Sequence, residues 1–64
     1  MLNMQVKHWN YGEGVVIREA YCKEDAPLEW QHDWESAVLV EFVCGTVPNQ
    51  YSEWVLREDL DVIV

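Results

Sequence analysis

The feature that most constrains this chain is an apolar, β-branched run that extends from Val38 to Gly45. The run is too short for a globular helix, and its closing glycine and its valines favour a buried strand. The two-residue period of a strand places Val38, Val40 and Phe42 on one face. Glu41 falls on the opposite face, so we expect that face to meet water. We therefore predict that this run is the central strand of a sheet.

Short segments with strand-like composition, separated by turn residues, fill most of the remaining chain. Two adjacent polar residues, Arg18 and Glu19, interrupt the alternation of the second segment, which predicts a β-bulge or a strand that leaves the sheet. The segment Tyr51–Arg57 suits either a strand or a short helix capped by Ser52. The expected strands are Gln5–Trp9, Gly14–Cys22, about Ser36–Cys44 and Asp61–Val64, with turns at Asn10–Gly14, Gly45–Gln50 and Arg57–Leu60.

The segment from Lys23 to Trp34 differs in character from the strands, because it is acidic and rich in tryptophan. It contains Pro27, and we expect either an ordered loop or a single helical turn over Leu28–Trp34 with the proline near its start. It is the longest irregular connection that the sequence predicts. Functional residues concentrate on such connections, so we look there first for a site.

The length of 64 residues predicts one domain, residues 1–64. A chain of this size buries only about 60% of the surface that its unfolded form exposes, so its core is small. Closing the sheet on itself protects the edges of a few short strands. We therefore expect an all-β fold, a small and strongly bent antiparallel barrel with one long acidic, tryptophan-rich loop.

The net charge of the chain is −8, from twelve Asp and Glu against four Lys and Arg. This balance argues against direct nucleic-acid binding, which needs Lys and Arg to displace counterions, and against anionic membrane surfaces. It favours a partner with a basic surface, steered in by long-range attraction. The same charge would also serve simply to keep a small protein in solution.

The sequence also bears on where the protein works. No segment approaches the ~18 apolar residues of a membrane span. The first residues lack a basic stretch followed by a long apolar one, which is the pattern of a secretory signal. Small secreted domains are usually dense in disulfides, whereas this chain has two cysteines, Cys22 and Cys44. We expect a cytoplasmic protein with both thiols reduced.

Several segments together resemble a known family. Val6–His8 followed by Tyr11–Val16 is similar to the V-x-H-x-x-(F/Y)-G-x-G-x-V opening of small bacterial SH3-like, Tudor-type barrels. Examples are the C-terminal barrel of UvrD/PcrA-type helicases and the RNA-polymerase-binding module of CarD-like factors. Val38–Gly45 resembles their V-x-V-x-F-x-x-G strand, and Leu60–Ile63 their closing L-x-V-I. The chain departs from them in its acidity and in its tryptophan-rich Trp30–Trp34 insertion.

The resemblance implies a five-strand SH3-like barrel and a non-catalytic docking role. Some members of this family bind RNA polymerase, and others contact nucleic acid. The acidity of this chain argues against the second of these roles.

The residues offer no pattern typical of catalysis or of a metal site. The segment Gly12–Gly14 lacks the third glycine and the following helix of a phosphate-binding loop. The residue types of a zinc site are present but lack paired spacing: His8, Cys22, His32 and Cys44. We expect no metal, no cofactor and no enzymatic activity, and we expect His8 to pack inside the barrel mouth with a ring nitrogen bonded to backbone.

Aromatic side chains gather in or beside the predicted connections. A cation over a tryptophan face gains about 0.5–2 kcal/mol, and neighbouring carboxylates reinforce the attraction for Lys or Arg. We expect Trp9 and Trp54 to lie in the core, whereas Trp30 and Trp34 suit the core or the surface equally. The predicted partner-binding residues are Tyr11, Glu29, Trp30, Asp33, Trp34, Tyr51 and Glu53.

Three hypotheses of function follow. The first is a non-catalytic module that docks a basic protein surface through the aromatic and acidic loop, and the resemblance points to transcription or DNA repair. The small size also fits a phage- or plasmid-encoded regulator. The second is an acidic DNA-mimic inhibitor of a nucleic-acid-binding protein. The third is homodimerisation through an unpaired apolar strand at Val62–Val64.

Overall fold

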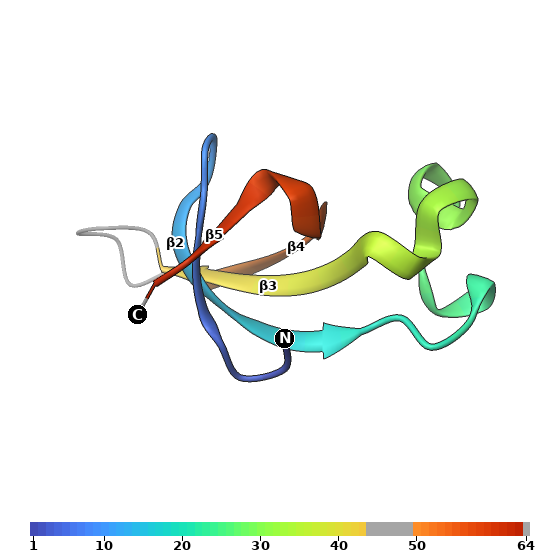
Figure 1. Ribbon diagram of the computed structural model, residues 1–64, viewed down its shortest axis with the longest axis horizontal. Coiled ribbons are helices and arrows are strands. Elements are labelled where there is room, and N and C mark those ends of the chain that lie inside the picture. Colours follow the sequence, from blue (N-terminus) through green and yellow to red (C-terminus); the bar gives the residue numbers. More distant parts are fainter. Residues whose placement is uncertain (44–49, 64) are drawn as a thin grey trace.

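The computed structural model describes residues 1–43 and 50–63, which form a single antiparallel sheet of five strands (Figure 1). The strands are β1 (Gln5–His8), β2 (Gly12–Glu19), β3 (Ala37–Val43), β4 (Gln50–Leu56) and β5 (Leu60–Val62). Their order in the sheet is β4-β3-β2-β1-β5, so β4 and β5 form its two edges. The predicted all-β class is confirmed.

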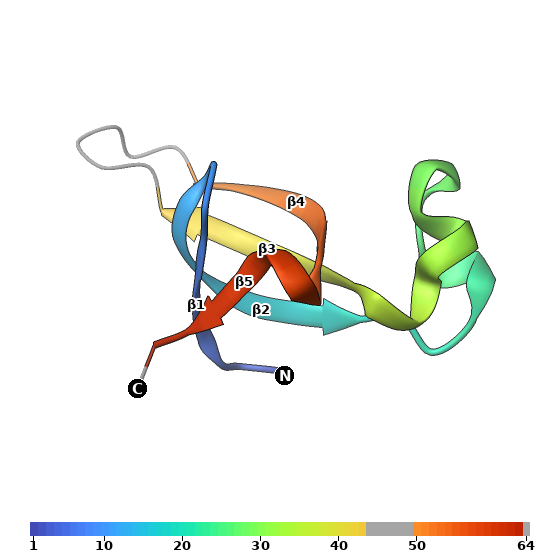
Figure 2. The ribbon, with the colours of Figure 1, turned by 45° about the horizontal axis from the view of Figure 1, so that its top comes forward.

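Three short 3-10 helices connect these strands: η1 (Lys23–Asp25), η2 (Leu28–Ser36) and η3 (Arg57–Asp59). Of the two alternatives for the acidic segment, the helical one is confirmed in type and in its start after Pro27. It is longer than the single turn expected over Leu28–Trp34, since η2 continues to Ser36 and kinks at Asp33. In both ribbon views η1 and η2 lie at one end of the molecule (Figures 1 and 2). None of the helices in the described ranges is long and apolar enough to cross a membrane.

The C-terminal part of the chain resolves an ambiguity of the sequence. In the segment Tyr51–Arg57, residues 51–56 are strand rather than capped helix, since they belong to β4 and pair with β3, whereas Arg57 begins η3. The tight turn expected after it is η3, and the last strand is shorter than predicted. The predicted turn at Gly45–Gln50 lies outside the described residues except for its last residue, which begins β4.

β2 is the strand that bends, and the bulge predicted there is confirmed. The pairing with β3 shifts register between Val16 and Arg18, which leaves Ile17 as the extra residue. An extra residue on one strand bends that strand and increases its twist. β2 accordingly curves between its two neighbours, β1 and β3 (Figure 2).

The inner face of the sheet carries the main core. Val38, Val40 and Phe42 are fully buried on this face, as the two-residue period predicts. Burying one such side chain contributes about 1.5–3 kcal/mol. The complete cluster of buried residues is Val6, Val16, Val38, Val40, Phe42 and Val55. The other face of β3 is only half-buried at Leu39 and Glu41.

A second, smaller cluster joins the η1–η2 connection to the sheet. Its buried members are all alanines, and three indoles pack against them. Alanine projects only a methyl group, so an indole can lie close to the backbone beneath it. The alanines are Ala20, Ala26 and Ala37, and the indoles are those of Trp30, Trp34 and Trp54. We call these six residues the alanine–tryptophan cluster.

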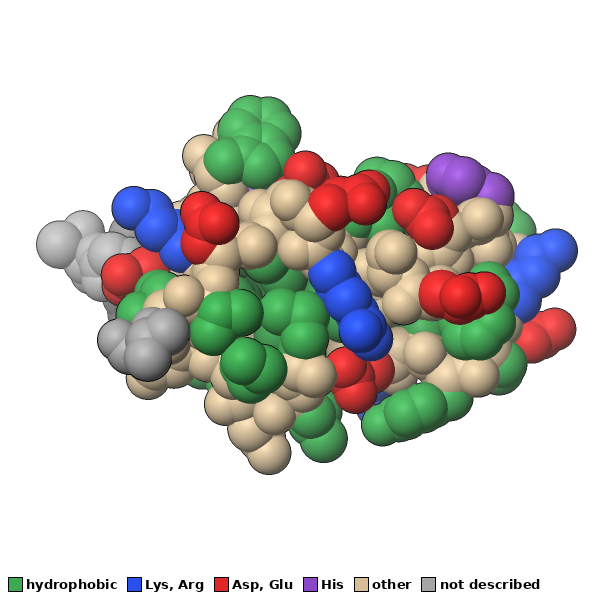
Figure 3. All heavy atoms as spheres, in the orientation of Figure 1, with side chains coloured by type: hydrophobic (Ala, Val, Ile, Leu, Met, Phe, Trp, Pro, Cys, Tyr) green, Lys and Arg blue, Asp and Glu red, His purple; other side chains and the backbone are tan. Residues whose placement is uncertain are grey.

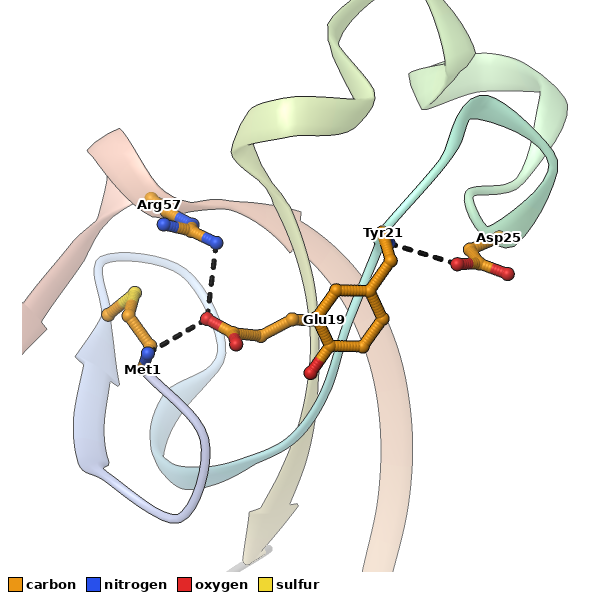
Figure 4. A network of polar contacts seen from close by, with 5 residues as sticks. All are labelled: Met1, Glu19, Tyr21, Asp25 and Arg57. Carbon is orange, nitrogen blue, oxygen red and sulfur yellow. Dashed lines mark hydrogen bonds and ion pairs between the residues drawn. The ribbon is translucent and has the colours of Figure 1, made fainter.

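One carboxylate joins three distant parts of the chain. Glu19, at the end of β2, accepts a hydrogen bond from the terminal amine of Met1 at 2.8 Å and pairs with Arg57 at 3.1 Å (Figure 4). The bond from the amine, aided by the charges of the amine and of Arg57, lowers the pKa of Glu19 below its usual value. The charged form of Glu19 therefore stabilises the fold.

The first prediction concerns the two glycines at the start of β2. A Cβ on Gly14 would lie 2.7 Å from the Glu41 carbonyl oxygen and 2.7 Å from Val40 Cγ1. We expect Gly14→Ala to lower the free energy of unfolding by about 1–3 kcal/mol through overpacking. Gly12 has open space around it but a φ of +86°, so Gly12→Ala should cost only about 1 kcal/mol. Urea unfolding measures both, and a smaller loss in Gly14→Ala than in Gly12→Ala would contradict this account.

The second prediction concerns the contribution of Glu19 to the stability of the fold at low pH. Because the pKa of Glu19 is lowered by folding, its contribution to stability is present above its unfolded pKa and is lost as the pH falls through its folded pKa. We expect Glu19→Gln to cost about 1 kcal/mol at neutral pH. The difference from the parent chain should vanish at low pH. Thermal unfolding from pH 7 to pH 2 tests this, with Glu58→Gln on the exposed η3 turn as control. A difference that is independent of pH would refute the assignment.

Candidate functional site

A groove of about 290 Å³ lies between the β1–β2 turn, η2, and the end of β4 with η3. Four aromatic side chains and three carboxylates line it: Trp9, Tyr11, Trp30, Trp54, Glu29, Glu53 and Asp59. We call it the aromatic–acidic groove. In the space-filling view, acidic side chains gather along one margin of the molecule, between the β1–β2 turn and η2 (Figure 3).

His8 holds the β1–β2 turn that supplies one wall of the groove. Its ring is almost fully buried, and Nδ1 accepts hydrogen bonds from the backbone N–H groups of Asn10 at 3.0 Å and Tyr11 at 3.3 Å. The ring also stacks on Trp9 and lies 4.8 Å from the ring of Tyr11. The expectation that His8 packs inside with a ring nitrogen bonded to backbone is confirmed.

Trp30 fixes the opposite wall. Its Nε1 donates a hydrogen bond to the backbone oxygen of Trp54 at 3.1 Å, which attaches η2 to β4. At the start of η2, the Trp30 backbone N–H donates to the carbonyl of Pro27 at 2.9 Å. The indole is half-buried, so one side packs on the alanine–tryptophan cluster while the remainder borders the groove.

Glu53 has an unusual position for a carboxylate. In the β3–β4 register it lies opposite Val40, so its side chain emerges on the inner face of the sheet, beside the main core. It is half-buried. Within the described ranges the only ion pairs are those of Glu19 with Met1 and Arg57. Glu53 and its two acidic neighbours in the groove therefore have no cation beside them there.

The aromatic rings of the groove continue into the core. Tyr11 lies 5.2 Å from Phe42 and 6.1 Å from Tyr51, measured between ring centroids. The ring of Phe42 is also 5.8 Å from that of Tyr51. Rings at these separations attract one another beyond the area they bury. Tyr11, which lines the groove, is therefore packed against an aromatic part of the core.

The structure divides the predicted partner-binding residues. Those that line the aromatic–acidic groove are Tyr11, Glu29, Trp30 and Glu53. Tyr51 does not line the groove, but its ring lies 6.1 Å from that of Tyr11, which does. Asp33 and Trp34 border a separate hollow of about 200 Å³, at the end of η2 beyond its kink.

The prediction that Trp9 lies in the core is wrong, because 77% of its surface is exposed. Along β1 the side chains alternate, and Val6 and His8 point inward, so the next position points outward. The same alternation was available in the sequence and would have identified the residue. Trp54 is half-buried and packs on the alanine–tryptophan cluster rather than in the main core.

Besides Trp9, which was placed in the core, sequence reasoning missed two residues of the groove, Asp59 and Trp54. Asp59 lies in η3, and the sequence gives no signal that this turn approaches the β1–β2 turn. Trp54 lines the groove as well, although it was expected only as a core residue. Both reach the groove because β4 and η3 bring a late segment of the chain beside an early one.

The thiol of Cys22 lies outside this groove. It is exposed, and desolvation, followed by a hydrogen bond with Glu24, raises its pKa. The reactive thiolate is therefore less populated than in a free cysteine. Cys44, the other cysteine, lies outside the described residues.

Comparison with protein-family profiles, with curated proteins and with solved structures gave no match.

The third prediction tests the anchoring of η2. Trp30→Phe keeps an aromatic ring but removes the N–H that bonds the Trp54 carbonyl, and we expect a loss of about 1 kcal/mol. Trp34→Phe is the matched control, because it shortens a second indole of the same cluster that has no such bond in the described chain. Hydrogen exchange of the η2 amides should accelerate more in Trp30→Phe. Equal acceleration in both variants would show that ring size, not the bond, holds η2.

Proposed function

We propose that this chain is a cytoplasmic, non-catalytic interaction module that binds lysine or arginine side chains of a protein partner in the aromatic–acidic groove. The observation that carries the proposal is Glu53, a half-buried carboxylate on the inner face with no cation beside it in the described chain. Burying a carboxylate costs free energy unless it gains a partner. A cationic side chain from outside would supply that partner.

The aromatic walls fit the same ligand. A guanidinium or ammonium group over a tryptophan face is attracted by the negative face of the ring, and the attraction grows when the site excludes water. Trp9 is exposed and stacks on His8, and Trp30 is held by its hydrogen bond, so the groove offers two indole faces from opposite walls. Tryptophan and tyrosine are also favoured anchors of protein interfaces.

The proposal includes the finer architecture, an SH3-like, Tudor-type five-strand barrel. Its support is the strand order, the bulged β2 shared between two neighbours, and the single η3 turn before the last strand. The resemblance in the opening motif and the net charge of −8 together favour the basic surface of a transcription or DNA-repair protein as partner. Direct binding of nucleic acid is disfavoured by the same charge.

The fourth prediction uses a blocked peptide in which arginine and threonine alternate, titrated by calorimetry. We expect Glu53→Gln to weaken binding about tenfold, since it removes a partly desolvated charge pair. Trp9→Ala should weaken it about threefold or more, as expected for a cation–π contact. The matched control is Glu24→Gln, which changes the net charge equally but lies in η1, outside the groove.

The alternative, an acidic DNA mimic, predicts a different pattern. A mimic would lose affinity equally in Glu53→Gln and Glu24→Gln, would tolerate Trp9→Ala, and would weaken steeply with salt. That pattern would overturn the groove proposal. Failure of the peptide to bind the unaltered chain at millimolar concentration would overturn it as well.

A further inference from the structure

β4 supplies part of the lining of the aromatic–acidic groove. It is also an edge strand, and within residues 1–43 and 50–63 its outer side pairs with no other strand. Figure 2 shows β4 at the margin of the sheet.

The direction of the backbone groups of β4 follows from the register. The C=O of Val16 accepts a hydrogen bond from the Asn3 N–H at 2.8 Å, and the N–H of Val16 donates to the Met4 carbonyl at 3.1 Å. Both backbone groups of Val16 therefore point away from β3. Val40 pairs with Val16 across the β2–β3 ladder, so the N–H and C=O of Val40 are directed toward β4. There they face the backbone of Glu53, its partner on β4.

It follows that the residues on either side of Glu53 direct their backbone groups outward, at the free edge. A second observation agrees: the carbonyl of Trp54 accepts its hydrogen bond from the Trp30 indole, which lies outside the sheet. Ser52 is the residue on the other side of Glu53, and its backbone groups are likewise directed to the free edge. Its N–H and C=O have no partner in the described chain, and its side chain is exposed.

We propose that the partner presents an extended basic segment, which adds to the edge of β4 as a sixth strand. This inference rests on the proposed function and specifies the form of its ligand. The backbone of the segment would bond Ser52, while the residue opposite Glu53 would lie on the inner face of the sheet. That residue is the lysine or arginine that enters the groove. Main-chain bonds would supply affinity, and the charge at this one position would supply specificity.

A second copy of this chain is a poor occupant of the same edge. In a β4–β4 pair centred on Glu53, the two Glu53 carboxylates would lie directly opposite each other, and like charges there are destabilising. Each copy also carries a net charge of −8. A basic segment meets neither obstacle.

The variant Ser52→Pro distinguishes binding through the backbone of Ser52 from binding through its side chain. Because the Ser52 N–H points away from β3, Ser52→Pro removes no bond within the sheet, and edge strands tolerate such a proline. Ser52→Ala is the matched control, which changes the side chain and keeps the N–H. The probe is the blocked peptide of alternating arginine and threonine. A peptide of equal composition with its arginines in one block controls for charge.

We expect Ser52→Pro to bind the alternating peptide about tenfold more weakly than Ser52→Ala does. The alternating peptide should bind the parent chain more tightly than the block peptide. In the parent chain, saturating peptide should slow hydrogen exchange of the Ser52 amide by about tenfold or more, a measurement that does not depend on the proline variant folding.

Two results would overturn strand addition while leaving the groove proposal intact. One is equal affinity of Ser52→Pro and Ser52→Ala when Glu53→Gln still weakens binding. The other is a Ser52 amide whose exchange is unchanged by saturating peptide. Absence of any peptide binding, or sedimentation that shows β4-dependent self-association instead, would overturn both proposals together.

Discussion

The pairing of β3 with β2 and β4 determines which side chains enter the main core and which face the groove. The alternation of β3 buries Val38, Val40 and Phe42 on the inner face. Because paired residues share a face, the same register places Glu53 inward and Trp54 outward. A slip of one residue would exchange the two faces of β4, and the fully buried core opposes such a slip.

A chain this small divides its limited apolar surface between two clusters. The main core is built of valines and one phenylalanine within the sheet. The alanine–tryptophan cluster lies outside it and attaches η1 and η2 by covering three methyl groups with three indoles. The tryptophans therefore serve the periphery rather than the centre. This arrangement places rigid aromatic surface next to solvent, where a partner can reach it.

Hydrogen bonds of His8 and Trp30 hold the two walls of the aromatic–acidic groove. His8 fixes the β1–β2 turn through two backbone bonds, and Trp30 fixes η2 through one. Neither wall depends on a charge pair, which leaves the carboxylates between them available. The cationic residues that do form ion pairs, Met1 and Arg57, are both held by Glu19. In the described chain the acidic groove thus has no internal cation to compete with a ligand.

Local pattern determined the elements of this fold. The two-residue period of Val38, Val40 and Phe42 set the buried face, the adjacent polar pair after Ile17 indicated the bulge, and Pro27 marked the start of η2. These features depend on neighbours in the chain, so the sequence carries them directly. Three predicted partner-binding residues, Tyr11, Glu29 and Trp30, lie on connections and reach one groove.

Only the tertiary structure decided which connections meet. The sequence could not show that Asp59 would face the β1–β2 turn, or that the kink at Asp33 would direct Trp34 to a different hollow from Trp30. It also could not place Glu53 beside the core, because that position follows from the β3–β4 register and not from any local pattern. Contacts between distant segments are fixed by packing and register, and these forces leave no periodic signature in the chain.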